Sequence, residues 1–131
     1  MKILSIILLV GCIIGALLIS SDLKTFIDIP SLLVVFIPVV ASIPARHGLE
    51  GFKMLSKEGE ERKDVLHSMG ATAIISGVLG THIGVVIMLG NLGDSSSLGP
   101  AIGISLLSTF YGLFIFLLTT VLSHLHIGKE L

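Results

Sequence analysis

Four long apolar segments without a charged side chain constrain this sequence more than any other feature. A helix needs about 20 mostly apolar residues to cross the hydrocarbon core of a bilayer. Only 13% of the residues are charged, about half the fraction found in an ordinary soluble domain. We therefore predict an all-α integral membrane protein with one domain, residues 1–131, and four transmembrane helices at about 3–20, 29–45, 67–92 and 98–125.

The basic residues predict the orientation of these spans, because cytoplasmic loops of membrane proteins are enriched in Lys and Arg. If both termini and the short loop 46–66 are cytoplasmic, Lys24 alone lies outside. We therefore expect an N-in and C-in protein of the bacterial cytoplasmic membrane. The seven basic residues then inside are Lys2, Arg46, Lys53, Lys57, Arg62, Lys63 and Lys129.

The cytoplasmic loop contains two further patterns. Leu49, Phe52 and Leu55 fall at helical spacing, which predicts a short amphipathic helix at the inner membrane surface. The mixed-charge run 57–64 is interpreted as a solvated helix extension or cap.

Small residues recur at three- and four-residue spacing in the third and fourth predicted spans. Such faces allow the backbones of two helices to approach closely in lipid. For the glycines we favour helix packing over a role in a pore wall. These glycines are Gly77, Gly80, Gly84, Gly103 and Gly112.

Hydroxyl side chains near the middle of the same two spans suggest an ion path. A threonine in a membrane helix often bonds only its own backbone carbonyl one turn back. Two helices that each bring a mid-span hydroxyl form a more specific pattern, because together they could offer oxygen atoms to a cation. We predict that Thr81, Ser105 and Thr109 line this path.

A fixed negative charge is missing from the predicted spans. Ion transport across a bilayer generally needs an ionisable group near the middle, and His82 is the one candidate for a proton relay. A small multidrug-type antiporter would need a membrane-embedded glutamate, which none of the four spans contains. We expect instead a channel wall that borrows a carboxylate from a partner.

Four stretches of the third and fourth spans form one block: residues 80–84 (GTHIG), 88–92 (MLGNL), 97–101 (SLGPA) and 106–112 (LLSTFYG). This block resembles the last two membrane helices of MotA-type flagellar stator subunits in the MotA/TolQ/ExbB proton channel family. It is closer to sodium-type PomA members than to TolQ or ExbB. Residues 22–33 are similar to the loop and second-helix start of MotA proteins.

The resemblance implies a mechanism and a set of partners. Five such subunits surround a dimer of a single-span MotB-, ExbD- or TolR-like protein, whose helix carries the essential aspartate. Thr81 and Thr109 fall on threonines that face the ion path in sodium-type stators. The implied function is an H⁺- or Na⁺-conducting subunit, without a cofactor, that converts ion flow into rotation or mechanical work.

The short loop 46–66 departs from the flagellar pattern, in which a long cytoplasmic segment touches the rotor. We therefore expect a minimal form without that domain. Two alternatives stay open: a non-conducting membrane scaffold, and a TolQ/ExbB-like energiser of an envelope process. An enzyme is not expected, because the sequence offers no nucleophile–base pair and no metal-ligand cluster near either membrane surface. Membrane lipid is an expected partner, whereas nucleic acid is not, because the chain has no strongly basic face and a net charge of −1.

Overall fold

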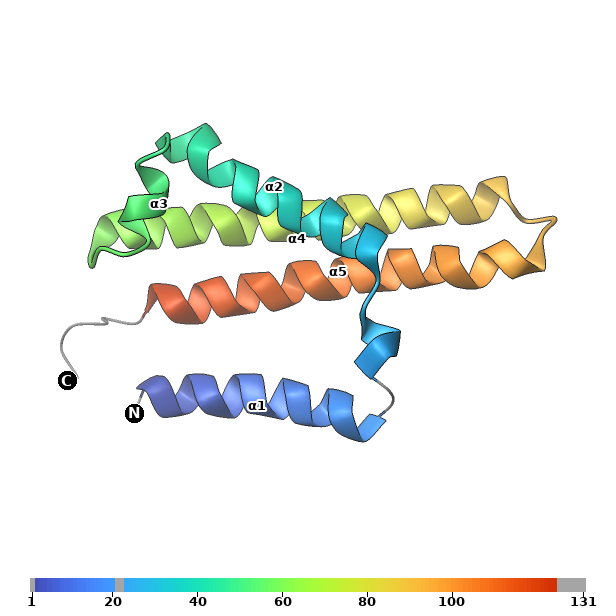
Figure 1. The fold of residues 1–131 in the computed structure, drawn as a ribbon, viewed down its shortest axis with the longest axis horizontal. Coiled ribbons are helices and arrows are strands. Elements are labelled where there is room, and N and C mark those ends of the chain that lie inside the picture. The colour runs from blue at the N-terminus through green and yellow to red at the C-terminus, as the bar shows by residue number, and fades with distance from the viewer. Residues whose placement is uncertain (1, 21–22, 125–131) are drawn as a thin grey trace.

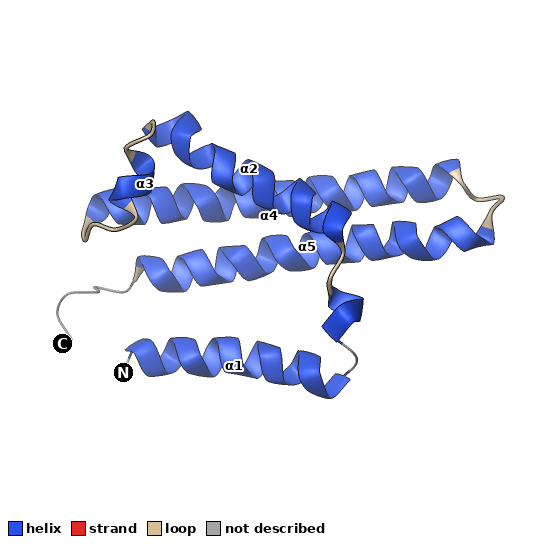
Figure 2. Ribbon diagram, viewed as in Figure 1, coloured by secondary structure: helices blue, strands red, loops and turns tan. Residues whose placement is uncertain are grey.

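The structure, a computed structural model, describes residues 2–20 and 23–124 and is built from helices (Figures 1 and 2). No strand occurs among these residues, so the all-α prediction is confirmed. The end expected for the fourth span, residue 125, lies outside the described residues. The elements are α1 Lys2–Ser20, the 3-10 helix η1 Leu23–Phe26, α2 Ile29–His47, α3 Gly51–Met54, α4 Glu60–Gly90 and α5 Ser95–Ser123.

Three of these helices, α2, α4 and α5, are long and apolar enough to cross a bilayer. α1 is a further apolar helix, but its qualifying apolar stretch, Ile6–Ala16, is shorter. Figure 1 draws α1 beside α5. Side chains of both helices, among them Ile13 and Phe114, line one apolar groove. Several of the large side chains of α1 are exposed: Leu4, Ile7, Leu8, Leu18 and Ile19. The four-span count therefore stays a prediction.

α4 and α5 form a long antiparallel pair that organises the fold (Figure 1). Glycines allow their closest approach. A Cβ atom placed on Gly112 would lie 2.5 Å from the Ala73 carbonyl oxygen and 3.1 Å from the Cα atom of Gly77. Because lipid is as apolar as the side chains, van der Waals packing between close backbones is what holds such helices together.

A short turn, residues 91–94, joins α4 to α5. Asp94 caps α5, because its carboxylate accepts hydrogen bonds from the Ser96 hydroxyl at 2.6 Å and from the Ser96 backbone N–H at 3.0 Å. These bonds to the charged form lower the pKa of the exposed Asp94 carboxyl below its ordinary value. The cap therefore stabilises the start of α5 at neutral pH and is lost only as the carboxyl becomes protonated in acid.

α2 crosses the α4–α5 pair and is fixed at its start by a hydrogen-bond cluster. The Asp28 carboxylate accepts hydrogen bonds from the Ser31 backbone N–H at 2.9 Å and from the Ser31 hydroxyl at 2.5 Å. The Tyr111 hydroxyl of α5 donates to the Phe26 carbonyl and accepts from the Asp28 backbone N–H at 3.2 Å. The cluster therefore ties the entry of α2 to the middle of α5.

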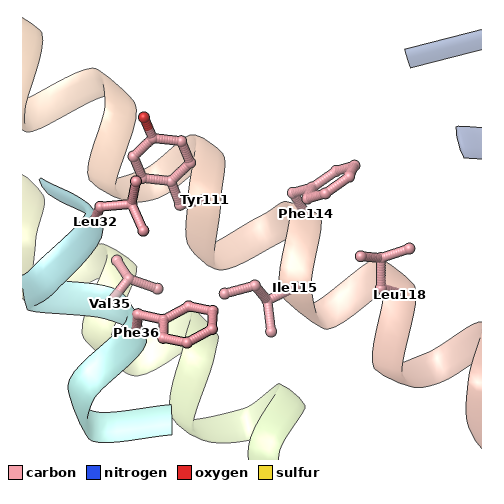
Figure 3. A pocket seen from close by; sticks show the side chains of 7 residues that line it. All are labelled: Leu32, Val35, Phe36, Tyr111, Phe114, Ile115 and Leu118. Atoms are coloured by element: carbon pink, nitrogen blue, oxygen red, sulfur yellow. The ribbon is translucent and has the colours of Figure 1, made fainter. Parts of the chain in front are cut away.

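Apolar packing completes the attachment of α2. Val35 and Val39 are buried together with Ala73 of α4. Figure 3 shows the groove beside this core, between α2 and α5, where the side chains present apolar surface. The groove is lined by Leu32, Val35, Phe36, Tyr111, Phe114, Ile115 and Leu118.

The segment predicted as the loop 46–66 is partly helical. α4 begins at Glu60, ahead of the expected span start at residue 67, because the charged segment forms the first turns of the helix. Ion pairs between residues three and four apart support this extension, namely Lys63–Glu60 at 2.7 Å and Lys57–Glu61 at 3.6 Å. These pairs are exposed, so each contributes little to stability.

The predicted amphipathic piece of the loop corresponds to α3. This helix is only four residues long, and Phe52 in it is 44% exposed. Leu49, just before it, is 81% exposed. Exposed apolar side chains beside charged ones are typical of the boundary between headgroups and hydrocarbon.

The contact at Gly112 generates the first prediction. Gly112→Ala should lower the free energy of unfolding by about 1–3 kcal/mol, the usual cost of overpacking, because the new methyl group would overlap the Ala73 carbonyl. Gly103→Ala is the matched control on the same helix, since a Cβ atom there meets no atom within 4 Å. Unfolding in mixed micelles by titration with sodium dodecyl sulfate measures both. Equal destabilisation by the two variants would contradict the assigned contact.

Candidate functional site

Three hydroxyl side chains meet where the middle of α4 faces the middle of α5. Thr81 Oγ1 lies 2.9 Å from the Ser105 carbonyl oxygen, 3.1 Å from the Gly77 carbonyl oxygen and within hydrogen-bond contact of Thr109 Oγ1. The Ser105 hydroxyl donates to the Thr81 carbonyl at 3.3 Å. The structure thus brings together Thr81, Ser105 and Thr109, the three residues selected from the sequence.

The number of hydroxyl protons limits the hydrogen bonds within this hydroxyl cluster (Thr81, Ser105 and Thr109). A hydroxyl group has one proton to donate and two lone pairs to accept with. The single Thr81 proton therefore has three possible acceptors, the two carbonyl oxygens and Thr109 Oγ1, and either threonine can donate the bond between the two hydroxyls. In either arrangement the Thr109 oxygen keeps at least one lone pair that this bond does not use.

Glycines on both helices permit this meeting of hydroxyls. A Cβ atom on Gly80 would lie 2.5 Å from the Ser108 side chain, and one on Gly84 would lie 2.7 Å from the Ser105 backbone nitrogen. Gly77 would meet the Ser108 carbonyl at 2.9 Å. Four of the five glycines predicted to pack therefore lie in the α4–α5 contact: Gly77, Gly80, Gly84 and Gly112.

Gly103 differs from the other four glycines. A Cβ atom placed on it would meet nothing within 4 Å. The residue is half-buried and does not lie in the contact between α4 and α5. A packing or pore-wall role for Gly103 stays a prediction that concerns neighbours outside this chain.

The hydroxyl cluster is half-buried, whereas the residue before each of its two threonines is buried. On α5, Ser108 is fully buried, and a Cβ atom on its neighbour Gly80 would lie 3.2 Å from Val34 of α2. Thr81 and Thr109 each follow one of these buried residues and so lie about 100° further round their helices. Both threonines are half-buried, unlike the buried residues that precede them.

The sequence patterns did not single out Ser108, which lies in the same region. Its side chain is 0% exposed, and its hydroxyl has no hydrogen-bond partner within the described part of the chain. A buried hydroxyl without a partner costs free energy. The glycine spacing of α4 was the available signal, because Gly80 leaves room for a side chain of the facing helix, and that side chain is Ser108.

The hydroxyl cluster has polarity but no charge of its own. Between residues 65 and 90 of α4 and throughout α5 the sequence contains no Asp, Glu, Lys or Arg. Neutral oxygens can replace part of the hydration shell of a cation, yet they cannot balance its charge in a medium of low dielectric constant. Taken alone, the cluster therefore lacks the negative charge that a cation site in a membrane needs.

His82 stands apart from the hydroxyl cluster. It is exposed, and its Nδ1 atom lies 2.7 Å from the Val78 carbonyl oxygen. Because a carbonyl only accepts, Nδ1 must carry a proton, which leaves Nε2 as the acceptor of the neutral ring. A relay role for His82 stays a prediction.

Comparison with known proteins agrees with the chemistry of this region. The sequence model of the MotA/TolQ/ExbB proton channel family matches residues 50–129, which include α4, α5 and the whole hydroxyl cluster. A chemotaxis protein, PomA, of Vibrio alginolyticus is 42% identical over 48 residues, which cover 37% of this chain and 19% of PomA.

Two proteins named motility protein A are also similar. The one from Cereibacter sphaeroides is 56% identical over 36 residues, which cover 28% of this chain and 14% of that protein. The one from Aquifex aeolicus is 50% identical over 36 residues, with the same coverage of 28% and 14%. The chain therefore covers less than a fifth of the length of these relatives.

The hydrogen bond between the Thr81 and Thr109 hydroxyls generates the second prediction. In a double-mutant cycle, Thr81→Val and Thr109→Val should couple by about 0.6–1.7 kcal/mol, the range of hydrogen bonds between membrane helices. Thr81→Val combined with Thr120→Val is the control cycle, because among the described residues the Thr120 hydroxyl bonds only the Phe116 carbonyl of its own helix. Unfolding in mixed micelles measures the four free energies of each cycle. Additive effects of Thr81→Val and Thr109→Val would contradict a direct bond between them.

Proposed function

The chain belongs to the MotA/TolQ/ExbB proton channel family, and we propose that it is an ion-conducting subunit of a complex that converts an ion-motive force into mechanical work. It is a multi-pass protein of the bacterial inner membrane. The family is one of channels, not of enzymes. The observation that carries the proposal is the half-open hydroxyl cluster in the α4–α5 contact.

The proposed topology has four spans, with α1 as the first and α2, α4 and α5 as the others. Both chain ends and the segment between α2 and α4 are cytoplasmic in this arrangement, which puts seven of the eight basic residues inside. A membrane-impermeant thiol reagent tests it on Cys12→Ser variants with one new cysteine. Glu58→Cys should be protected in intact cells and Ser96→Cys should react, whereas the reverse pattern would refute the orientation.

The proposed mechanism divides a cation site between two proteins. A single-span partner supplies a carboxylate, which balances the charge of H⁺ or Na⁺. Thr109 and Ser105 offer oxygen atoms that replace water around the ion as it passes that carboxylate. Thr81 holds these groups in position, because its hydroxyl contacts both.

The proposed assembly is a homopentamer of this chain around a dimer of the partner, as in the flagellar subunits that the sequence resembles. Five copies would close a ring of α4–α5 pairs whose half-open hydroxyl clusters face the partner helices. Native mass spectrometry of the chain co-expressed with a single-span protein from the neighbouring reading frame measures this composition. A stable monomer or dimer that never binds such a partner would exclude it.

The work that the complex performs differs from ordinary flagellar torque in this proposal. Only α3 lies between α2 and α4, so that connection has no room for a large rotor-contacting domain. A TolQ/ExbB-like energiser of an envelope process therefore stays a second form of the same function.

A non-conducting scaffold is the alternative from another class, and one observation favours it. The Thr81 hydroxyl finds all its hydrogen-bond partners within the chain, so the cluster could serve only to hold α4 against α5. Conduction and packing can be separated, because serine keeps a hydroxyl while valine keeps the shape of threonine.

The third prediction makes that separation. The double variant Thr81→Val with Thr109→Val should reduce ion flux through the assembled complex at least about tenfold, which corresponds to ~1.4 kcal/mol in the barrier. The matched serine variants should retain most of the flux. Influx of H⁺ and of Na⁺ into proteoliposomes, measured separately, reports the effect and identifies the ion.

Thr120→Val is the control, since in the part of the chain that the structure describes its hydroxyl bonds only a carbonyl of its own helix. Assembly with the partner must be intact in every variant compared. If the valine variant assembles and conducts as well as the unmodified protein, the hydroxyl cluster serves packing alone and its proposed role in the ion path fails. If the assembled, unmodified complex conducts neither ion, the scaffold interpretation stands and the channel proposal fails.

A further inference from the structure

The end of α2 lies near the beginning of α4 (Figure 1). A cleft lies between them, lined mainly by polar side chains from residues 46–47 and 64–71, whereas the hydroxyl cluster lies further along α4, at Thr81. The volume of the cleft is about 440 Å³, within the ordinary range of ligand sites, about 300–1,000 Å³. We define the inner cleft by its lining residues: Arg46, His47, Asp64, His67, Ser68 and Ala71.

Two opposite charges line the inner cleft without neutralising each other. Within the described part of the chain, neither the Arg46 guanidinium nor the Asp64 carboxylate takes part in a hydrogen bond or an ion pair. The nearby lysines Lys53, Lys57 and Lys63 each pair with a glutamate outside the cleft. Arg46 and Asp64 are therefore free to contact a ligand that enters between α2 and α4.

His47 adds an independent sign of a ligand. Its Nε2 atom is buried, and no hydrogen-bond partner for it exists among the residues that the structure describes. Buried polar atoms are nearly always paired, so this atom needs a partner, which a water molecule or a ligand in the cleft would supply. Across the cleft, His67 is exposed and supplies a second imidazole.

The position of the inner cleft selects the kind of ligand. Arg46 comes directly after the apolar run of α2, and exposed Leu49 and Phe52 follow it in the chain. This order places the cleft at the level of the lipid headgroups, where phosphate is the most abundant anion and arginine is a preferred partner for it.

The charge pattern narrows the ligand further. Arg46 and the imidazoles suit a phosphate, whereas Asp64 would repel a second anion and suits an ammonium group. We propose that the inner cleft binds the headgroup of an aminophospholipid, that is, a phosphate and a primary ammonium as in phosphatidylethanolamine. The phosphate lies against Arg46 and His47, and the ammonium donates hydrogen bonds to the Asp64 carboxylate.

This lipid site does not depend on ion conduction. It requires only that α2 and α4 be inserted in a membrane. None of its residues belongs to the hydroxyl cluster, so flux measurements and lipid-binding measurements can fail separately.

The fourth prediction concerns lipid selectivity. The full-length protein, purified in its native assembly, is exchanged into nanodiscs with equal mole fractions of phosphatidylethanolamine, phosphatidylcholine and phosphatidylglycerol. Native mass spectrometry then measures the retained lipid. We expect phosphatidylethanolamine to exceed phosphatidylcholine about tenfold, which corresponds to ~1.4 kcal/mol, because a choline group has no N–H to donate.

Variants assign this selectivity to the inner cleft. Asp64→Asn should bring retention of the ethanolamine lipid to within about twofold of the choline lipid, a difference of ~0.4 kcal/mol. Arg46→Gln should reduce retention of all three lipids. Glu61→Gln and Lys53→Gln are matched controls, since each removes the same kind of charge from the same region but outside the cleft.

Several results would overturn the proposal. These are equal retention of the three lipids, preferential retention of phosphatidylglycerol, or equal effects of the control and cleft variants. Soluble phosphoethanolamine distinguishes a lipid from a free phosphate, because it lacks acyl chains. If it competes as well as the intact lipid, the ligand is a small phosphate and not a membrane lipid.

Discussion

Backbone contact between α4 and α5 is the constraint from which the other features of this protein follow. Gly77 and Gly112 bring the two backbones to a separation that leaves no room for a Cβ atom. In lipid this packing must hold the helices together without help from the hydrophobic effect. The same contact places Thr81 next to Thr109, so the candidate ion site is a direct product of the packing.

The membrane explains why this contact is also a chemical site. A hydroxyl group in the core of a bilayer costs free energy unless it finds a partner inside the protein, because lipid offers it no hydrogen bond. Thr81 satisfies that demand across the helix pair rather than only within its own helix. The oxygens that remain half-open are too weakly polar to hold a cation alone. A carboxylate from a partner would complete the site, which accounts for a chain that has channel-like polarity but no intramembrane charge.

Helical spacing placed Ser105 and Thr109 on one face, and mid-span position together with the family resemblance selected Thr81. Ser105, Thr109 and Gly112 follow the four- and three-residue rhythm of one helix face, and Thr81 sits at the same depth on the preceding span. The rhythm could not say which partner a face meets. Gly103 shows this limit, because it follows the same spacing yet lies outside the α4–α5 contact.

The attachment of α2 and the inner cleft were beyond the reach of sequence patterns. Tyr111 and Asp28 are 83 positions apart and interact only because α2 crosses α5 at that point. Arg46 and Asp64 likewise come together through the angle between α2 and α4. Local periodicity defines faces and lengths, whereas these sites depend on how separate helices are placed in space.

Cysteine cross-linking to the partner helix tests the divided cation site most directly. Ser105→Cys, in a Cys12→Ser background, would be paired with single cysteines along the partner's single span. A disulfide requires Cα atoms about 4.4–6.8 Å apart. The account predicts cross-linking concentrated within one helical turn of the partner's carboxylate, and little from Leu106→Cys, which lies one residue further round α5. Equal cross-linking from positions 105 and 106, or a maximum far from the carboxylate, would contradict it.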